Sequence, residues 1–102
     1  MILEFSILPV GVGESLSKHV AGIVKIVEES GLPNRTHAMG TVVEGDWDEL
    51  LALVKRCHDE VLSKSPRVVT SIKIDDRPGK PGDRITGKLE SIEAILGREI
   101  NK

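Results

Sequence analysis

The chain has 102 residues, a formal net charge of −2, a single cysteine and, as its aromatic residues, only Phe5 and Trp47. Interspersed charges argue against nucleic-acid binding, which needs a basic stripe, and the shortage of rings argues against a stacking platform for single strands. One cysteine excludes an intramolecular disulfide and fits a reducing cytoplasm, and no apolar run approaches the ~20 residues of a membrane span. We therefore expect one cytoplasmic domain over residues 1–102, without a membrane or nucleic-acid partner.

A strand is predicted over residues 2–10, because apolar and polar side chains alternate along it. Its first residues lack the basic segment that begins a signal peptide. The expected core face of this strand is formed by Leu3, Phe5 and Ile7. A helix is predicted next, and Gly31 occupies the usual position just past a helix end. The apolar stripe of this helix consists of Leu16, Val20, Ile23, Val24 and Val27.

A hairpin follows, with predicted strands over residues 35–38 and 41–44 and a turn at Gly40. Met39 is a poor residue for the first position of a tight hairpin turn, so a bulged or longer loop is one possibility. Glu44 is the last residue of the second strand, and nothing in its local sequence requires a carboxylate there.

A second helix is predicted from Asp46, where an Asp-x-x-Glu pattern forms a capping box, to about Lys64. Its apolar stripe consists of Leu50, Leu51, Val54, Cys57, Val61 and, at the margin, Leu62. Residues 67–76 alternate as a fourth strand, residues 77–83 are rich in proline and glycine and predict a loop, and residues 86–100 predict a third helix.

The predicted order is βαββαβ with a C-terminal helix, which indicates an α+β, ferredoxin-like antiparallel sheet with two helices on one face. The other face mixes apolar and polar groups, and we expect a partner subunit, the third helix or a ligand to cover it. This open face holds Ile2, Glu4, Ser6, Leu8, Val69, Ser71 and Lys73, together with either Thr41 and Val43 or Val42 and Glu44.

Most chemical motifs are incomplete. Residues 82–88 match the first part of a phosphate-binding loop, but Leu89 follows where Ser or Thr is needed, so we expect a plain loop. The cysteine and the histidines lack metal-ligand spacing, and no nucleophile elbow is present. Asp75 and Asp76 could bind a cation or act as acid and base, but the adjacent Arg77 favours simple charge neutralisation.

The best candidate site brings hydroxyls, carboxylates and one ammonium group to a single region of the sheet. It consists of Glu44 with Thr41, Glu4, Ser6, Ser71 and Lys73. The alternative is a subunit interface with internal salt bridges. The two interpretations are compatible, because pockets often form where subunits meet.

Four stretches that span most of the chain resemble the small thiamine-binding protein family, the YkoF-like single-domain proteins. They are Ser30-Gly31, Met39-Gly-Thr-Val-Val-Glu-Gly45, Arg67-Val-Val-Thr-Ser-Ile-Lys-Ile-Asp-Asp-Arg77 and Lys88-Leu-Glu-Ser-Ile-Glu. The resemblance implies ferredoxin-like subunits assembled as homodimers or homotetramers. It also implies non-catalytic binding of thiamine or its hydroxymethylpyrimidine part, with no cofactor and no metal.

On that resemblance, Glu44 and Thr41 would satisfy the amino donor and the ring-nitrogen acceptors of the pyrimidine. Met39 would be a polarizable neighbour for the cationic thiazolium ring. Lys73 alone supplies little positive charge, so free thiamine or the pyrimidine should bind better than the diphosphate. The open face carries no aromatic residue, so aliphatic or methionine side chains, or Trp47, would have to cover the rings.

Two other functions remain open at this point. The protein could be a structural or regulatory oligomer whose open face serves only assembly. It could also be an enzyme that uses Asp75 and Asp76, which would require both carboxylates to face a cavity.

Overall fold

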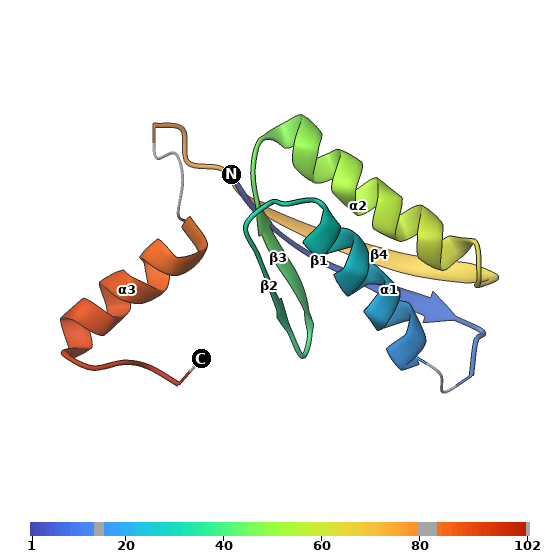
Figure 1. Cartoon of the computed structure of the whole chain (residues 1–102), viewed down its shortest axis with the longest axis horizontal. Helices are drawn as coiled ribbons and strands as arrows, with labels where there is room; N and C mark the ends of the chain where they lie inside the picture. Colours follow the sequence, from blue (N-terminus) through green and yellow to red (C-terminus); the bar gives the residue numbers. More distant parts are fainter. Residues whose placement is uncertain (14–15, 80–83, 102) are drawn as a thin grey trace.

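The sheet of this protein is four-stranded and antiparallel throughout, in the order β2-β3-β1-β4. The computed structural model describes residues 1–13, 16–79 and 84–101. The elements are β1 (Ile2–Val10), α1 (Leu16–Glu29), β2 (Asn34–His37), β3 (Gly40–Glu44), α2 (Trp47–Leu62), β4 (Arg67–Asp75) and α3 (Arg84–Leu96). Figure 1 shows α1 and α2 side by side on one face of the sheet, which confirms the predicted ferredoxin-like fold.

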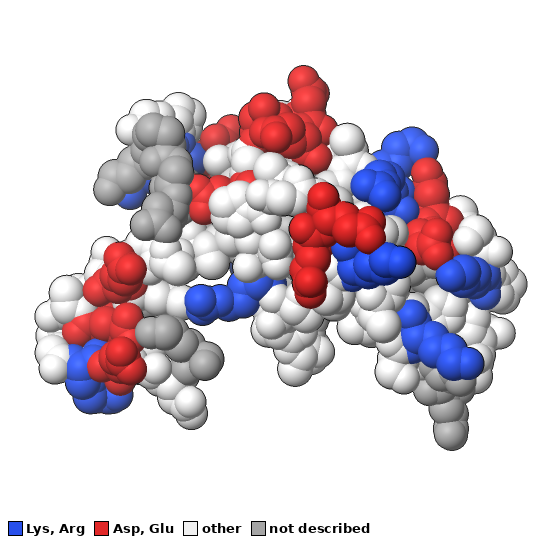
Figure 2. Space-filling model, in the orientation of Figure 1, with Lys and Arg blue, Asp and Glu red and all other residues white. Residues whose placement is uncertain are grey.

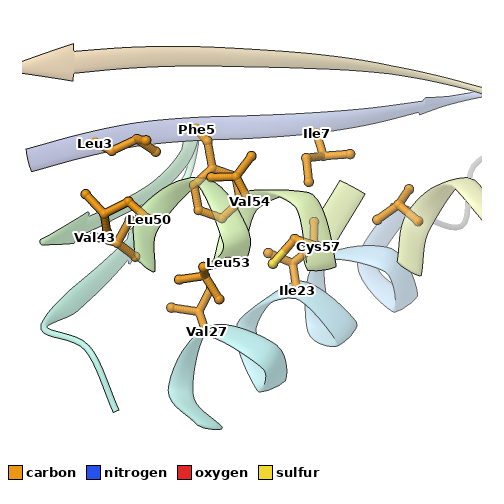
Figure 3. Close-up of a cluster of buried hydrophobic side chains, with 11 residues drawn as sticks. Leu3, Phe5, Ile7, Ile23, Val27, Val43, Leu50, Leu53, Val54 and Cys57 are labelled. Atoms are coloured by element: carbon orange, nitrogen blue, oxygen red, sulfur yellow. The ribbon is translucent and has the colours of Figure 1, made fainter. Parts of the chain in front are cut away.

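The core lies between that sheet face and the two helices (Figure 3). Alternation along β1 buries Leu3, Phe5 and Ile7, as the sequence predicts. The helices contribute Ile23, Val27, Leu50, Leu53, Val54, Cys57 and Val61. Burying each large apolar side chain contributes about 1.5–3 kcal/mol, so this cluster dominates the stability of the fold.

The helical stripes differ from the prediction in two ways. In α2, Leu53 is buried although it was not predicted to be, and Leu62 is exposed. Leu53 faces Val27 of α1 in Figure 3, so α2 buries one side against the sheet and another against its neighbouring helix. In α1, the first two stripe residues, Leu16 and Val20, remain 41% and 49% exposed.

Local signals fix the ends of several elements. Asp46 accepts a hydrogen bond from the Glu49 N–H at 2.8 Å, and Glu49 accepts one from the Asp46 N–H, which confirms the capping box. The hairpin closes through a two-residue turn, because His37 pairs directly with Gly40, and the bulged or longer loop is therefore wrong. Gly97, at φ +71°, ends α3 earlier than predicted.

The register decides which side chains share a face. Ile2 pairs with Glu44 and Phe5 with Thr41, so Glu44 and Val42 lie on the open face. Thr41 and Val43 lie on the face that the helices cover, where both are buried. The first of the two predicted arrangements of β3 is therefore wrong.

Beyond its first turn, which reaches Glu44, the third helix does not cover the open face. Figure 1 shows α3 standing away from the sheet, beyond the end at which β3 and α2 meet. Its side chains are largely exposed, and Ile95 is 85% exposed. None of the described helices is long and apolar enough to cross a bilayer.

Candidate ligand-binding site

A cavity of about 330 Å³ lies between α1 and the β2–β3 hairpin, and we call it the hairpin pocket. Phe5 and Ile7 of β1 contribute to its lining. Its walls come from Leu16, Val20, Ile23 and Val24 of α1 and from Thr36, Met39 and Thr41 of the hairpin. Its volume falls within the ~300–1,000 Å³ that is typical of small-molecule sites.

The pocket exists because the first half of α1 carries core-type residues that nothing in the described chain covers. Leu16 and Val20 follow the same helical stripe as the buried Ile23 and Val27. They face the hairpin across an empty volume, instead of packing against it. An apolar wall of this kind is suited to the flat face of a ring.

The pocket contains a hydroxyl that has no partner. Thr41 as a residue is 4% exposed, and its hydroxyl, which makes no hydrogen bond to the described residues, is open to the cavity. Thr36 lies directly opposite Thr41 in the hairpin and lines the same cavity. A threonine hydroxyl can both donate and accept a hydrogen bond, so Thr41 offers a donor and an acceptor to a ligand in the cavity.

The lining of the pocket is nearly uncharged. Among the described residues, His37 is the one ionisable side chain that lines it, and no lysine, arginine or carboxylate does. The Nδ1 atom of His37 accepts the Met39 N–H at 3.2 Å, which leaves the proton of the neutral ring on Nε2. That nitrogen lies 3.2 Å from the Glu4 carboxylate on the open face.

A second, smaller hollow of about 100 Å³ lies on the open face, and we call it the open-face hollow. Five predicted site residues line it: Glu4, Ser6, Met39, Ser71 and Lys73. A Cβ atom at the adjacent Gly40 would lie 2.7 Å from the Phe5 carbonyl oxygen, so only glycine fits against the backbone of β1 at this position. The hollow is below the usual size of a small-molecule site.

Glu44 belongs to neither cavity. Its side chain is buried, and it accepts a hydrogen bond at 3.3 Å from the N–H of Ile85, in the first turn of α3. A carboxylate at this position satisfies an otherwise unpaired N–H and interacts favourably with the helix dipole. Local sequence could not supply this reason, because the helix begins about forty residues later in the chain.

Asp75, the second acidic candidate, is paired with Lys88 of α3. Asp76 is exposed, and the described cavities are not lined by either carboxylate.

The described residues contain no group of three His, Cys, Asp or Glu side chains that could hold a metal ion. Burial raises the pKa of the Cys57 thiol to about 11, against a smaller opposing effect of Arg56. The thiol is consequently a core side chain and a poor nucleophile.

The seven predicted site residues are thus divided between three places. Five surround the open-face hollow, Thr41 lines the hairpin pocket, where Ser6 and Met39 also contribute, and Glu44 holds the start of α3. The sequence did not predict that Thr36, His37 and the apolar side chains of α1 line a pocket. Alternation along β2 could have found Thr36, because it places that residue on the same face as its partner Thr41.

A family model described as thiamine-binding protein matches residues 3–93. The chain belongs to the thiamine-binding protein family. Both cavities of the hairpin region and the start of α3 lie within the matched residues, which confirms the family resemblance seen in the sequence.

Relatives of this thiamine-binding family member cover nearly the whole chain. The UPF0045 protein Mb1933 of Mycobacterium bovis is 43% identical over 99 residues, 96% of each chain. The protein MJ1052 of Methanocaldococcus jannaschii has a solved structure with 44% identity and a TM-score of 0.81, covering 89% of this chain and 93% of its own. A Thermotoga maritima structure, 20% identical, has the same fold with a TM-score of 0.77 over 89% of this chain and 96% of its own. Its name provisionally assigns that protein to thiamine biosynthesis or salvage.

Proposed function

We propose that this protein binds thiamine or its hydroxymethylpyrimidine part, without catalysis, as a homo-oligomer that acts as a carrier, buffer or sensor. The observation that carries the proposal is the Thr41 hydroxyl, which makes no hydrogen bond to the described residues and lines a largely apolar cavity. Membership of the thiamine-binding protein family supports the choice of ligand.

The hairpin pocket suits an aminopyrimidine ring. Such a ring is flat and presents an amino donor beside ring-nitrogen acceptors. The hydroxyls of Thr36 and Thr41 can each donate and accept, so together they can satisfy both kinds of group. The aliphatic side chains of α1 would cover one face of the ring, and Phe5 adds an aromatic residue to the lining.

The uncharged lining also favours the unphosphorylated ligand. A diphosphate in this cavity would lose its hydration without gaining a lysine or arginine partner among the described lining residues, which is costly. The cationic thiazolium ring would point to the mouth of the pocket, where the largely exposed Met39 offers a polarizable thioether.

Assembly with further copies of the chain is proposed on the properties of α3 and the open face. A helix of 13 residues is only marginally stable alone in water, and α3 contacts the rest of the described chain mainly through Glu44 and Asp75. Its exposed apolar side chains are Ile92, Ile95 and Leu96. A second copy that covers this helix and the open sheet face would remove both exposed surfaces from water.

The test is isothermal titration of the ligand-free protein with thiamine, hydroxymethylpyrimidine and thiamine diphosphate, after its mass has been measured by light scattering. Micromolar or tighter binding of thiamine or the pyrimidine is expected. Thr41→Val removes the hydroxyl and keeps the shape, so it should weaken binding about tenfold. Stability should stay unchanged, because no protein hydrogen bond is lost.

Two further variants locate the site. Val20→Phe fills the pocket from the α1 side and should abolish binding, whereas Ser71→Ala, on the open face, should leave it unchanged. If Ser71→Ala loses ligand affinity and Thr41→Val keeps it, the ligand binds in the open-face hollow. Equal affinity for the diphosphate that is lost in Val20→Phe would contradict the uncharged pocket as the site.

The second candidate function is a structural or regulatory oligomer with no small ligand. The exposed apolar side of α3 is the observation that favours it, because assembly alone would account for that surface. A folded oligomer that binds none of the three compounds would support this second function and contradict the first.

A further inference from the structure

Gly22 lies in the middle of α1, where glycine destabilises a helix relative to alanine. Its backbone is not among the positive-φ glycines, and an added Cβ would meet no atom within 4 Å. Neither conformation nor close packing therefore requires glycine at this position. Because Gly22 has no side chain, the surface between α1 and α2 stays open at this position.

Two hollows meet at this glycine, on the side of α1 that faces away from the hairpin pocket. One has a volume of about 460 Å³ and is lined by Lys18, His19 and residues near the end of α2. The other has a volume of about 530 Å³ and reaches Lys25 and Arg56. Because both are lined by Gly22, Glu60 and Lys64, we treat them as one surface, the Gly22 groove.

The charges left available in the groove are mainly positive. Asp59 is held at 2.7 Å by Lys55, which is not a lining residue, and Glu60 is held at 2.7 Å by Lys64. Within the described parts of the chain, three cations of the groove have no ion pair: Lys18, Lys25 and Arg56. Glu29 is the remaining lining carboxylate. Figure 2 shows lysine and arginine side chains at this end of the molecule, interspersed with acidic ones.

We infer that the Gly22 groove binds a small phosphorylated anion carrying at least two negative charges, at a site separate from the hairpin pocket. Lys18 and Lys25 lie on either side of Gly22 along α1, and Arg56 approaches from α2, so a diphosphate group could be held from both helices. The half-buried His19 adds a donor at the same end. The absent side chain at Gly22 lets the anion lie close against the helix.

This inference is independent of the proposed function, because the two cavities lie on opposite sides of α1. The hairpin pocket offers hydroxyls and apolar walls, and the Gly22 groove offers cations. A ligand suited to one is poorly suited to the other, so each can be tested while the other is disabled.

The experiment is titration of the full chain at low salt with inorganic pyrophosphate, with orthophosphate and citrate as the comparison anions. Pyrophosphate should bind measurably below about 1 mM and more tightly than either comparison anion. Gly22→Gln, which fills the groove, and Lys18→Gln, which removes an unpaired cation, should each weaken binding about tenfold. Thr41→Val should have no effect on it.

Matched controls make the result decisive. Gly87→Ala replaces another helix glycine with open space around it, and Lys73→Gln removes the same charge from the open sheet face. Both should bind pyrophosphate as the unchanged protein does. The inference is overturned if pyrophosphate does not bind, if Gly22→Gln folds and binds normally, or if Lys73→Gln weakens binding as much as Lys18→Gln. Citrate binding equal to that of pyrophosphate would also overturn it, since carboxylates would then suffice.

Discussion

The two faces of the sheet are built from the same strands but offer different surfaces. On the helix side, β1 presents Leu3, Phe5 and Ile7 to a dry core and to an uncharged pocket of about 330 Å³. On the open side, the same strand presents Glu4 and Ser6 to a shallow hollow of about 100 Å³. Because side chains alternate with a period of two, neighbouring residues serve different purposes, and a one-residue change of register would exchange them.

The largest expected effect contrasts the two faces within β1. Leu3→Ala removes a fully buried side chain and should lower the free energy of unfolding by about 2–5 kcal/mol. Leu8→Ala truncates a side chain that is 52% exposed on the open face, and should cost less than about 1 kcal/mol in the monomer. Urea denaturation of both variants measures the difference. Equal losses would mean that the open face is as well packed as the core, which would require a partner to cover it.

How far the sequence could predict these faces depends on the length of each strand. In the nine-residue strands β1 and β4, alternation alone placed the side chains that it assigned, such as Phe5 and Ser71, on the faces that the structure shows. In β3, with five residues between two turns, the same rule left both assignments open, and only the pairing of Phe5 with Thr41 decides between them. Thr41 was grouped in the predicted site with residues of the open face, but this pairing places it on the face that the helices cover.

Contacts between residues far apart in the chain set a second limit on prediction from the sequence. Glu44 stood out because no neighbour in the sequence explains a carboxylate there, and the explanation is the first turn of α3. The sequence also did not predict that Leu16 and Val20 of α1 line a cavity. Leu16 and Val20 have the spacing of core residues, so nothing in the pattern distinguishes a side chain that fills the core from one that lines a cavity.

A variant of intermediate effect tests the role of Glu44. Glu44→Gln keeps the size of the side chain but removes the charge that holds the Ile85 N–H. We expect α3 to lose about 1–2 kcal/mol of local stability, seen as faster amide exchange in that helix and as weaker assembly of the proposed oligomer in light scattering. Thiamine affinity per folded protomer should be nearly unchanged. If Glu44→Gln loses ligand binding while the amides of α3 still exchange slowly, Glu44 contacts the ligand.

The smallest expected effect comes from the contact that joins the two faces, the pair between His37 and Glu4. Both side chains are partly exposed, and surface pairs of this kind contribute about 0–1 kcal/mol, so Glu4→Gln should barely change the midpoint of denaturation. His37 also lines the hairpin pocket, where its Nδ1 atom fixes the Met39 N–H at the hairpin tip. If the pair orients this ring, Glu4→Gln should weaken ligand binding by about two- to threefold, measured by the same titration that is used for Thr41→Val. Because Gln keeps the length of the side chain, a loss as large as that of Thr41→Val would mean that the ligand contacts Glu4 directly and that the open face forms part of the site.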